Sequence, residues 1–138
     1  MARGIDSCAH LGAIEKGLTA AVLGSGLNVC YPAENKYLME CIEGSGCVIS
    51  EYPPDKRPNK YTFPSRNRII SGMSEAVIVV EAASKSGALI TADFALEQGR
   101  EVFAFEIDSG EYCKGNKKLL NEGAIPIKNI SDFISTYT

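Results

Sequence analysis

The stretch that says most about the fold runs from residue 63 to residue 81 and reads FPSRNRIISGMSEAVIVVE. Its first half is typical of a helix that begins near Pro64, because proline carries the helical backbone angle and needs no amide partner in the first turn. Its second half, residues 76–81, is an apolar run typical of a strand covered on both faces. A helix that leads directly into a buried strand favours a layered α/β domain.

The rest of the chain repeats this alternation. Further strands are expected at residues 18–24, 47–51, 102–106 and 125–128, and helices are expected to begin near Asp6, Pro32, Ser86, Gly115 and Ser131. The pattern predicts a three-layer, Rossmann-like α/β domain with a mostly parallel sheet flanked by helices. Because 138 residues that are 45% hydrophobic suit one core, residues 1–138 are expected to form a single domain.

Three polar residues at the start of the predicted helix indicate a site for an anion. Arg66, Asn67 and Arg68 follow Pro64 at once, where free amides and the positive end of the helix dipole also favour negative charge. The surrounding segment from residue 55 to residue 68 adds to this effect, since it holds five basic residues and one acidic residue. Arg66 and Arg68 are two positions apart and cannot share a helix face. One of them, by preference Arg66, is expected to meet a phosphate, and the other is expected to form a structural ion pair with Glu81 or Glu51.

The charge and composition exclude several classes of protein. A formal net charge of −3 does not fit a polycationic nucleic-acid binder, so the local basic segment favours a specific anionic ligand. The chain contains no apolar stretch near the ~20 residues of a membrane span and no apolar leader. Five scattered cysteines without a C-x-x-C pair are typical of reduced thiols. These features predict a cytoplasmic protein with no membrane partner.

Glycine-rich turns follow two of the predicted strands. The turn Gly24-Ser25-Gly26 suits the carboxyl edge of a sheet, where backbone amides can face a phosphate and Ser25 can supply a polar contact. The dinucleotide fingerprint fails, because Val29 stands where its third glycine belongs. Ser86 is positioned to cap the next helix. No cofactor is therefore expected.

The sequence gives no support for catalysis. His10 is the one histidine, and its neighbours on the first predicted helix suggest that it packs rather than reacts. The acidic residues Glu81, Asp93 and Glu97 do not have a recognised metal-ligand spacing. We expect neither a catalytic group nor a metal site.

An ordered set of motifs resembles the bacterial DNA-processing protein A family, also called Smf. The resemblance is collinear over nearly the whole chain and rests on ARGID (2–6), VLGSGL (22–27), YP (31–32), EN (34–35), SEYP (50–53), FPxRNRIISG (63–72), VVEA (79–82), SGxLITA (86–92), ALEQGREVFA (95–104) and GNxxLLxxGA (115–124). Family members carry a further strand and a Ser-Gly-Leu turn before the ARGID motif. Relative to them, this chain is expected to be truncated at its N-terminus.

The resemblance implies a protein that binds single-stranded DNA without catalysis. It also implies protection of the DNA and loading of a RecA-type recombinase during natural transformation or recombination, and a homodimer formed through the later part of the domain. Carried over to this sequence, it makes Arg3 and Lys60 phosphate contacts and Phe63 a platform for a base. Arg66 fits the same site, as do the polar residues Ser25 and Asn67, and Arg68 is a further candidate.

An alternative function remains open at this point. Related Rossmann-like domains bind nucleotides or cleave nucleotide-sugar bonds, and they resemble this chain in the anion-binding edge of the sheet. Those enzymes use a Pro-Gly-Gly-x-Gly-Thr turn, whereas residues 83–88 of this chain read ASKSGA. This difference favours single-stranded DNA over nucleotide-sugar cleavage.

Overall fold

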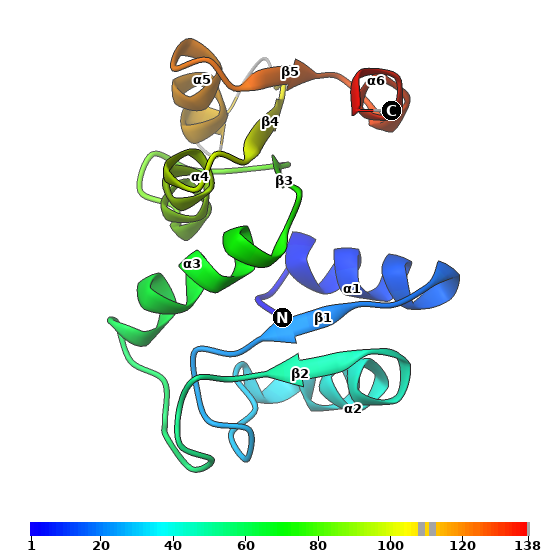
Figure 1. Cartoon of the computed structure of the whole chain (residues 1–138), viewed down its shortest axis with the longest axis vertical. Helices are drawn as coiled ribbons and strands as arrows, with labels where there is room; N and C mark the ends of the chain where they lie inside the picture. The colour runs from blue at the N-terminus through cyan, green and yellow to red at the C-terminus, as the bar shows by residue number, and fades with distance from the viewer. Residues whose placement is uncertain (108–109, 111–112, 138) are drawn as a thin grey trace. The chain divides into compact units, whose positions relative to one another are not determined.

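The computed structural model of the chain describes residues 1–107, 110 and 113–137 (Figure 1). The described elements, in chain order, are α1 (Ile5–Lys16), β1 (Ala20–Val22), the short 3-10 helix η1 (Ala33–Asn35), α2 (Lys36–Ser45), β2 (Cys47–Ile49), α3 (Thr62–Met73), β3 (Ala76–Val79), α4 (Gly87–Glu97), β4 (Glu101–Phe105), α5 (Lys114–Asn121), β5 (Ile125–Ile127) and α6 (Ile130–Tyr137). Every strand pair is parallel in the part of the chain that is described. The predicted α/β class with parallel strands flanked by helices is confirmed.

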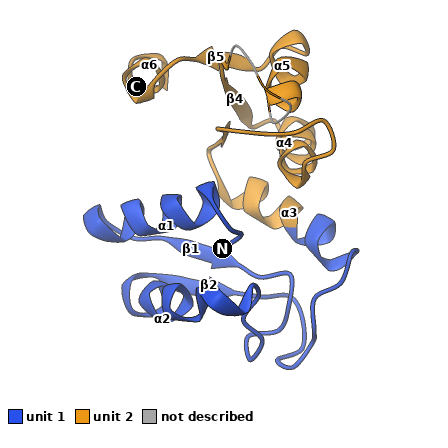
Figure 2. Ribbon diagram, turned by 180° about the vertical axis from the view of Figure 1, so that it is seen from behind, with its two compact units in different colours: residues 1–66 blue, residues 67–138 orange. Residues whose placement is uncertain are grey.

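The chain divides into two compact units, Met1–Arg66 and Asn67–Thr138 (Figure 2). The boundary falls inside helix α3, so that unit 1 ends on the first part of this helix and unit 2 begins on its second part. All five predicted strands are present. Strand β1 is shorter than expected at both ends, β2, β3 and β5 end earlier than expected, and β4 begins and ends one residue earlier. That residues 1–138 act as a single domain stays a prediction.

Unit 1 is built on the parallel pair β1 and β2. Ala20 pairs with Cys47 and Val22 with Ile49, and the amide of Leu23 extends the ladder by donating to the Ile49 carbonyl over 2.8 Å. A parallel pair needs a crossover, which is supplied here by η1 and α2. The amphipathic helix α2 buries one face, and the core of unit 1 consists of Met1, Ala21, Leu23, Leu38, Met39 and Ile42. Burial of this apolar surface is the main favourable term in the folding of the unit.

Unit 2 contains a three-stranded parallel sheet in the order β3-β4-β5. Helix α4 lies against it, and the Ser86 side chain caps this helix as predicted by accepting a hydrogen bond from the Ala88 amide at 3.2 Å. The core consists of small and branched apolar residues: Val79, Ala82, Leu89, Ala92, Ala95, Val102, Ala104 and Leu119. The alanines of α4 allow the helix to pack closely on the strands.

A buried amide side chain joins the carboxyl ends of β3 and β4. Asn116, on α5, has no exposed surface, and its Nδ2 lies within hydrogen-bond distance of the carbonyl oxygens of Val79 (3.2 Å), Val80 (3.0 Å) and Phe105 (3.1 Å). Its Oδ1 accepts from the amide of Ala82 at 2.8 Å. Backbone groups that leave the sheet here have no further strand to pair with, so Asn116 supplies the hydrogen bonds that the ladder cannot.

We expect Asn116→Ala to lower the free energy of unfolding by about 2–5 kcal/mol, because it leaves several buried backbone groups without a partner. Urea unfolding followed by circular dichroism measures this loss. Asn121→Ala is the matched control, since Asn121 is an exposed amide on the same helix, and a change within about 0.5 kcal/mol is expected for it. Equal losses in the two variants would contradict the role of Asn116.

Candidate functional site

The carboxyl end of β1 leads into a turn that lies against the start of α3. The Phe63 ring packs directly on Gly24: a Cβ atom at position 24 would lie 2.8 Å from Cδ1 of this ring, closer than side-chain atoms approach. The absence of a side chain at Gly24 therefore makes room for the ring. This contact places Phe63, one of the predicted site residues, over the end of β1.

The turn itself is held by hydrogen bonds within unit 1. The Ser25 hydroxyl is buried and donates to the Val29 carbonyl at 2.7 Å, while the Ser25 carbonyl accepts from the Ser50 hydroxyl at 2.6 Å. The Gly26 amide donates to the Lys56 carbonyl at 2.9 Å. We expected the amides of this turn to face a phosphate, and this is wrong for Gly26, because the loop after β2 already accepts its hydrogen bond.

Helix α3 begins two residues before the expected position. Its first residue is Thr62, so Arg66 lies one full turn into the helix. The Asn59 side chain caps this end, since its Oδ1 accepts from the amides of Tyr61 (2.8 Å) and Thr62 (3.1 Å). The amide of Thr62, the first in this helix, is therefore occupied within the chain and is not open to an anion.

Arg66 turns back from α3 toward the sheet of unit 1. Its Nη1 donates a hydrogen bond to the carbonyl oxygen of Val22, the last residue of β1. Its guanidinium carbon lies 5.9 Å from the centre of the Phe63 ring, within the range of a cation–π contact. Burial lowers the pKa of this guanidinium, and the nearby Asp6 and Tyr52 oppose the shift. The group stays charged at neutral pH, because arginine does not lose its proton in proteins.

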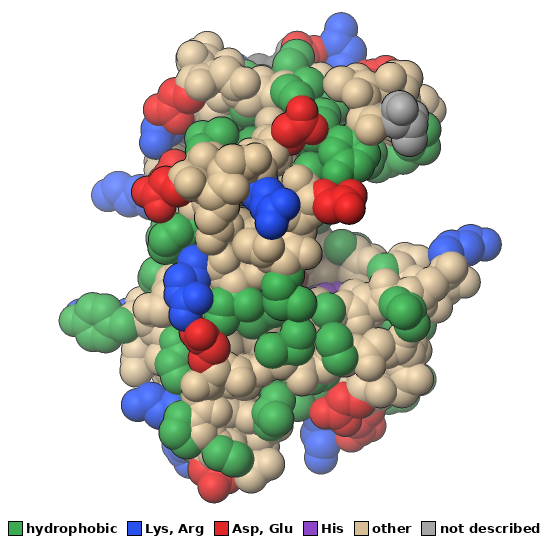
Figure 3. Space-filling view, viewed as in Figure 1, with side chains coloured by type: hydrophobic (Ala, Val, Ile, Leu, Met, Phe, Trp, Pro, Cys, Tyr) green, Lys and Arg blue, Asp and Glu red, His purple; other side chains and the backbone are tan. Residues whose placement is uncertain are grey.

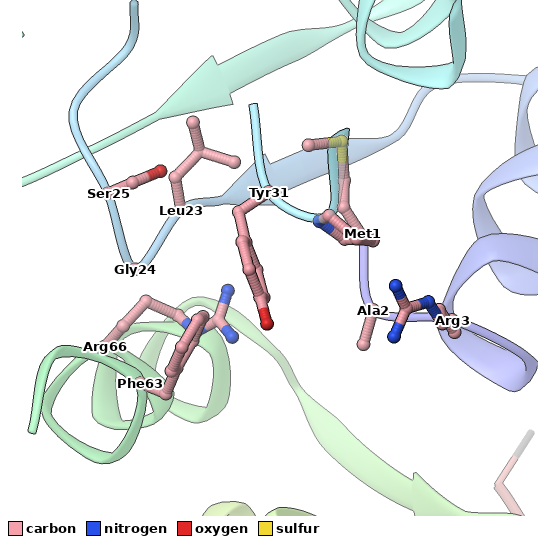
Figure 4. Close-up of a pocket in the computed structure, with 10 residues that line it drawn as sticks. Met1, Ala2, Arg3, Leu23, Gly24, Ser25, Tyr31, Phe63 and Arg66 are labelled. Carbon is pink, nitrogen blue, oxygen red and sulfur yellow. The ribbon is translucent and has the colours of Figure 1, made fainter. Parts of the chain in front are cut away.

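These residues surround a pocket of about 240 Å³ in unit 1 (Figure 4). Its lining consists of Met1, Ala2, Arg3, Leu23, Gly24, Ser25, Tyr31, Pro32, Phe63 and Arg66. Tyr31 and Phe63 form an aromatic pair with ring centres 5.5 Å apart and planes inclined by 46°. In Figure 4, Tyr31 points toward Phe63 and Arg66, while Arg3 lies across the pocket beyond Met1 and Ala2. The pocket thus combines a mostly apolar wall with two arginines.

Arg3 is the exposed cation of this pocket. Its side chain is 74% exposed and forms an ion pair through Nε with Oε1 of Glu34, which raises the pKa of Arg3 and lowers that of Glu34. The backbone beside Arg3 is fixed by Asn35, whose Nδ2 donates to the Met1 carbonyl (2.9 Å) and to the Ser7 hydroxyl (3.0 Å). A solvent-exposed ion pair contributes little to stability, so a phosphate can compete with Glu34 for Arg3.

Lys60 is exposed at the end of the loop that precedes α3. Its ammonium lies 5.0 Å from the centre of the ring of Tyr61, whose side chain is also exposed. Neither residue lines the pocket. On the face drawn in Figure 3, basic and acidic side chains are interspersed, which agrees with a local rather than a general attraction for anions.

Two predicted site residues belong to unit 2. Asn67 is buried, and its Nδ2 lies 3.2 Å from the Gly87 carbonyl at the start of α4. Arg68 is exposed, and its backbone carbonyl accepts a hydrogen bond from Nε2 of Gln98 at 2.9 Å. The structure therefore groups Arg3, Ser25, Phe63 and Arg66 around one pocket and places Asn67 and Arg68 in the other unit.

Histidine and cysteine side chains take part in neither a metal-holding cluster nor a disulfide in the described part of the chain. His10 is half-buried, with Nδ1 2.7 Å from the Thr19 hydroxyl, and desolvation lowers its pKa. Among residues 1–107, 110 and 113–137, no three histidine, cysteine or acidic side chains come together in a way that would hold a metal ion. The five cysteines, which are all described, form no disulfide.

Three residues of the site were missed by the sequence analysis. Tyr31 adds a second ring to the pocket, Glu34 neutralises Arg3, and Asn59 caps α3. The Tyr31-Pro32 and Glu34-Asn35 pairs were visible as motifs. Their spacing does not reveal, however, that Glu34 contacts Arg3, which lies 31 positions earlier in the chain. Asn59 carried a usable signal, because asparagine side chains commonly accept hydrogen bonds from backbone amides a few residues further along the chain.

The fold and this pocket define the class of protein: a parallel α/β, Rossmann-like protein with an arginine and aromatic pocket beside the end of a strand. The chain belongs to the family described as DNA recombination-mediator protein A, whose model matches residues 1–138. No helix in the described ranges is both long and apolar enough to span a membrane.

Known relatives agree with this assignment. The chain is 44% identical over 140 residues to the DNA processing protein DprA of Streptococcus pneumoniae, an alignment that covers 99% of this chain and 49% of that protein. It is 49% identical over 128 residues to Protein Smf of Escherichia coli, covering 91% of this chain and 34% of that protein. The chain thus spans half or less of the length of these relatives.

Two solved structures have the same fold. The X-ray structure of S. pneumoniae DprA matches 97% of this chain and 48% of that chain with a TM-score of 0.89 and 43% identity. A structure of DNA processing protein A from Helicobacter pylori, described for its single-stranded DNA binding mode, matches 97% of this chain and 61% of that chain with a TM-score of 0.88 and 32% identity.

The close approach of Phe63 to Gly24 can be tested by stability. Gly24→Ala places a methyl group against the ring, and we expect a loss of about 1–3 kcal/mol in the free energy of unfolding. Gly44→Ala is the matched control: Gly44 lies in α2 with no atom within 4 Å of an added Cβ, so it is expected to gain about 0.5–1 kcal/mol. Thermal unfolding measures both, and a Gly24→Ala variant as stable as wild type would contradict the packing described.

Proposed function

We propose that this protein binds single-stranded DNA, without catalysing a reaction, at the pocket of unit 1. The observation that carries the proposal is the combination of an exposed arginine with two neighbouring aromatic rings, Tyr31 and Phe63, on one pocket. Sequence-independent binding of single strands needs aromatic faces on which bases stack and cations that meet the backbone. Arg3 and Lys60 supply the cations, and the rings supply the stacking surface.

The pocket has room for one base rather than for a large ligand. Its volume of about 240 Å³ lies below the range of about 300–1,000 Å³ that is usual for pockets of drug-sized molecules. A strand longer than one nucleotide therefore continues over the surface of the molecule, where Lys60 is exposed. Membership of the mediator family and the DNA-binding relative from H. pylori support single-stranded DNA as the polymer.

The wider role follows from the family. We propose that the protein protects single-stranded DNA in the cytoplasm, hands it to a RecA-type recombinase during natural transformation or recombination, and does so as a homodimer. The description of the family as recombination mediators supports this role. Because the chain spans half or less of the aligned relatives, the recombinase and dimer contacts are proposals for the protein to which this chain belongs.

Salt dependence tests the phosphate contacts. Anisotropy of a labelled oligo-thymidine should show binding that weakens as salt rises, with a slope of log affinity against log salt of about −0.7 for each phosphate contact. Arg3→Ala and Lys60→Ala should each weaken binding roughly tenfold and reduce the steepness of the slope by about 0.7, because each removes one phosphate contact.

Glu34→Gln tests the role of Arg3 in the opposite direction, because it should strengthen binding rather than weaken it. It removes the carboxylate that competes with phosphate, and we expect binding that is roughly twofold to fivefold tighter.

The proposed function is wrong if wild-type protein does not bind the oligonucleotide at low salt, or if duplex DNA competes as well as single strands do. Release of free base from nucleoside monophosphates would instead support a nucleotide-cleaving enzyme.

The aromatic pair provides a second test. Phe63→Ala and Tyr31→Ala should each weaken binding by roughly fivefold or more, because stacking contributes about 1–3 kcal/mol per base, and neither should change the salt slope. Tyr37→Ala is the control, since Tyr37 is an exposed tyrosine of the same unit that does not line the pocket. An equal loss in Tyr37→Ala and Tyr31→Ala would show that the pocket is not the stacking site.

A further inference from the structure

Arg66 differs from the other cations near the pocket in what it touches. Its guanidinium donates to the Val22 carbonyl at the end of β1 and lies 5.9 Å from the centre of the Phe63 ring. Arg3, in contrast, is 74% exposed and pairs only weakly with another exposed side chain, Glu34. Arg66 thus faces the backbone and the aromatic wall of the pocket (Figure 4).

The burial of Arg66 makes a change of partner unfavourable. Val22 is 7% exposed, so its carbonyl would lose its hydrogen bond to Arg66 in a place that water reaches poorly. The guanidinium is itself half-buried. Moving the guanidinium away from this carbonyl to reach a phosphate would also take it away from the Phe63 ring.

We propose that Arg66 is a positioning residue, which holds Phe63 in place for base stacking and does not itself neutralise a phosphate. This inference rests on the proposed function, because the stacking role of Phe63 belongs to it. Two contacts hold Phe63: Gly24 lies against the Cδ1 and Cε1 atoms of its ring, and the guanidinium of Arg66 lies 5.9 Å from the ring centre. A ring that is already fixed loses little freedom when a base stacks on it, and this preorganisation raises affinity.

The salt slope separates a positioning residue from a phosphate contact. We expect Arg66→Met to weaken binding of oligo-thymidine roughly tenfold, because it releases Phe63, and to leave the slope of log affinity against log salt unchanged. Arg3→Ala and Lys60→Ala are the comparison, since each should reduce the slope by about 0.7. A reduction of the same size in Arg66→Met would overturn the proposal, as would wild-type affinity.

Arg66→Lys adds a conservative test. Lysine keeps the charge but lacks the planar group that lies on the ring and donates to Val22. If Arg66 is a positioning residue, Arg66→Lys should weaken binding of oligo-thymidine almost as much as Arg66→Met does. Full affinity with lysine would show that the charge alone is needed, which contradicts the proposal.

A measurement without DNA keeps the test independent of the proposed function. With 4-fluorophenylalanine in place of all five phenylalanines, the fluorine resonance of Phe63 can be assigned from a Phe63→Leu variant. We expect this resonance to move toward the position of a solvent-exposed ring in Arg66→Met and to stay unchanged in Arg57→Met, an exposed arginine of the same unit. An unmoved resonance in Arg66→Met overturns the positioning role, whereas absence of DNA binding by the wild type overturns only the proposed function.

Discussion

The structure depends on the parallel direction of its strands. Parallel neighbours cannot be joined by tight turns, so each strand is followed by a crossover before the next strand begins. The carboxyl ends of paired strands therefore meet at one edge, and the connecting loops gather there. In unit 1 this edge carries the Gly24 turn and the pocket, because the helix that follows β2 returns its first residues to the end of β1.

At this edge, backbone groups at the strand ends lack a partner in the sheet. In both units, a side chain from a later helix forms hydrogen bonds with them. In unit 1, Arg66 donates to the carbonyl of Val22. In unit 2, Asn116 lies within hydrogen-bond distance of carbonyls at the ends of β3 and β4 and accepts from the amide of Ala82. Buried carbonyls are rarely left without a partner, so each of these polar residues is needed where a strand ends. In unit 1 the residue that meets this need also contacts the aromatic wall of the pocket, which links the stability of the fold to the shape of the site.

Much of the secondary structure could be predicted from the sequence because it depends on local patterns. Apolar runs marked all five strands, and Ser86 marked the start of α4. The start of α3 was placed two residues late, because Pro64 suits several positions of a first turn and Asn59 was not considered as the cap. That side chain satisfies the amides of Tyr61 and Thr62, a contact that spacing alone did not reveal.

The sequence by itself determined the α/β class, the family and the residue types that suit single-stranded DNA, since these follow from hydrophobic periodicity and from motifs that are contiguous along the chain. Only the tertiary structure decided which of those residues are exposed to a ligand and which are held by contacts within the protein. Arg3 and Arg66 are both arginines within conspicuous motifs, yet one is exposed beside Glu34 and the other is half-buried against Val22. The physical reason is that the surroundings of a charge, its burial and its partners, are set by segments far apart in sequence that folding brings together.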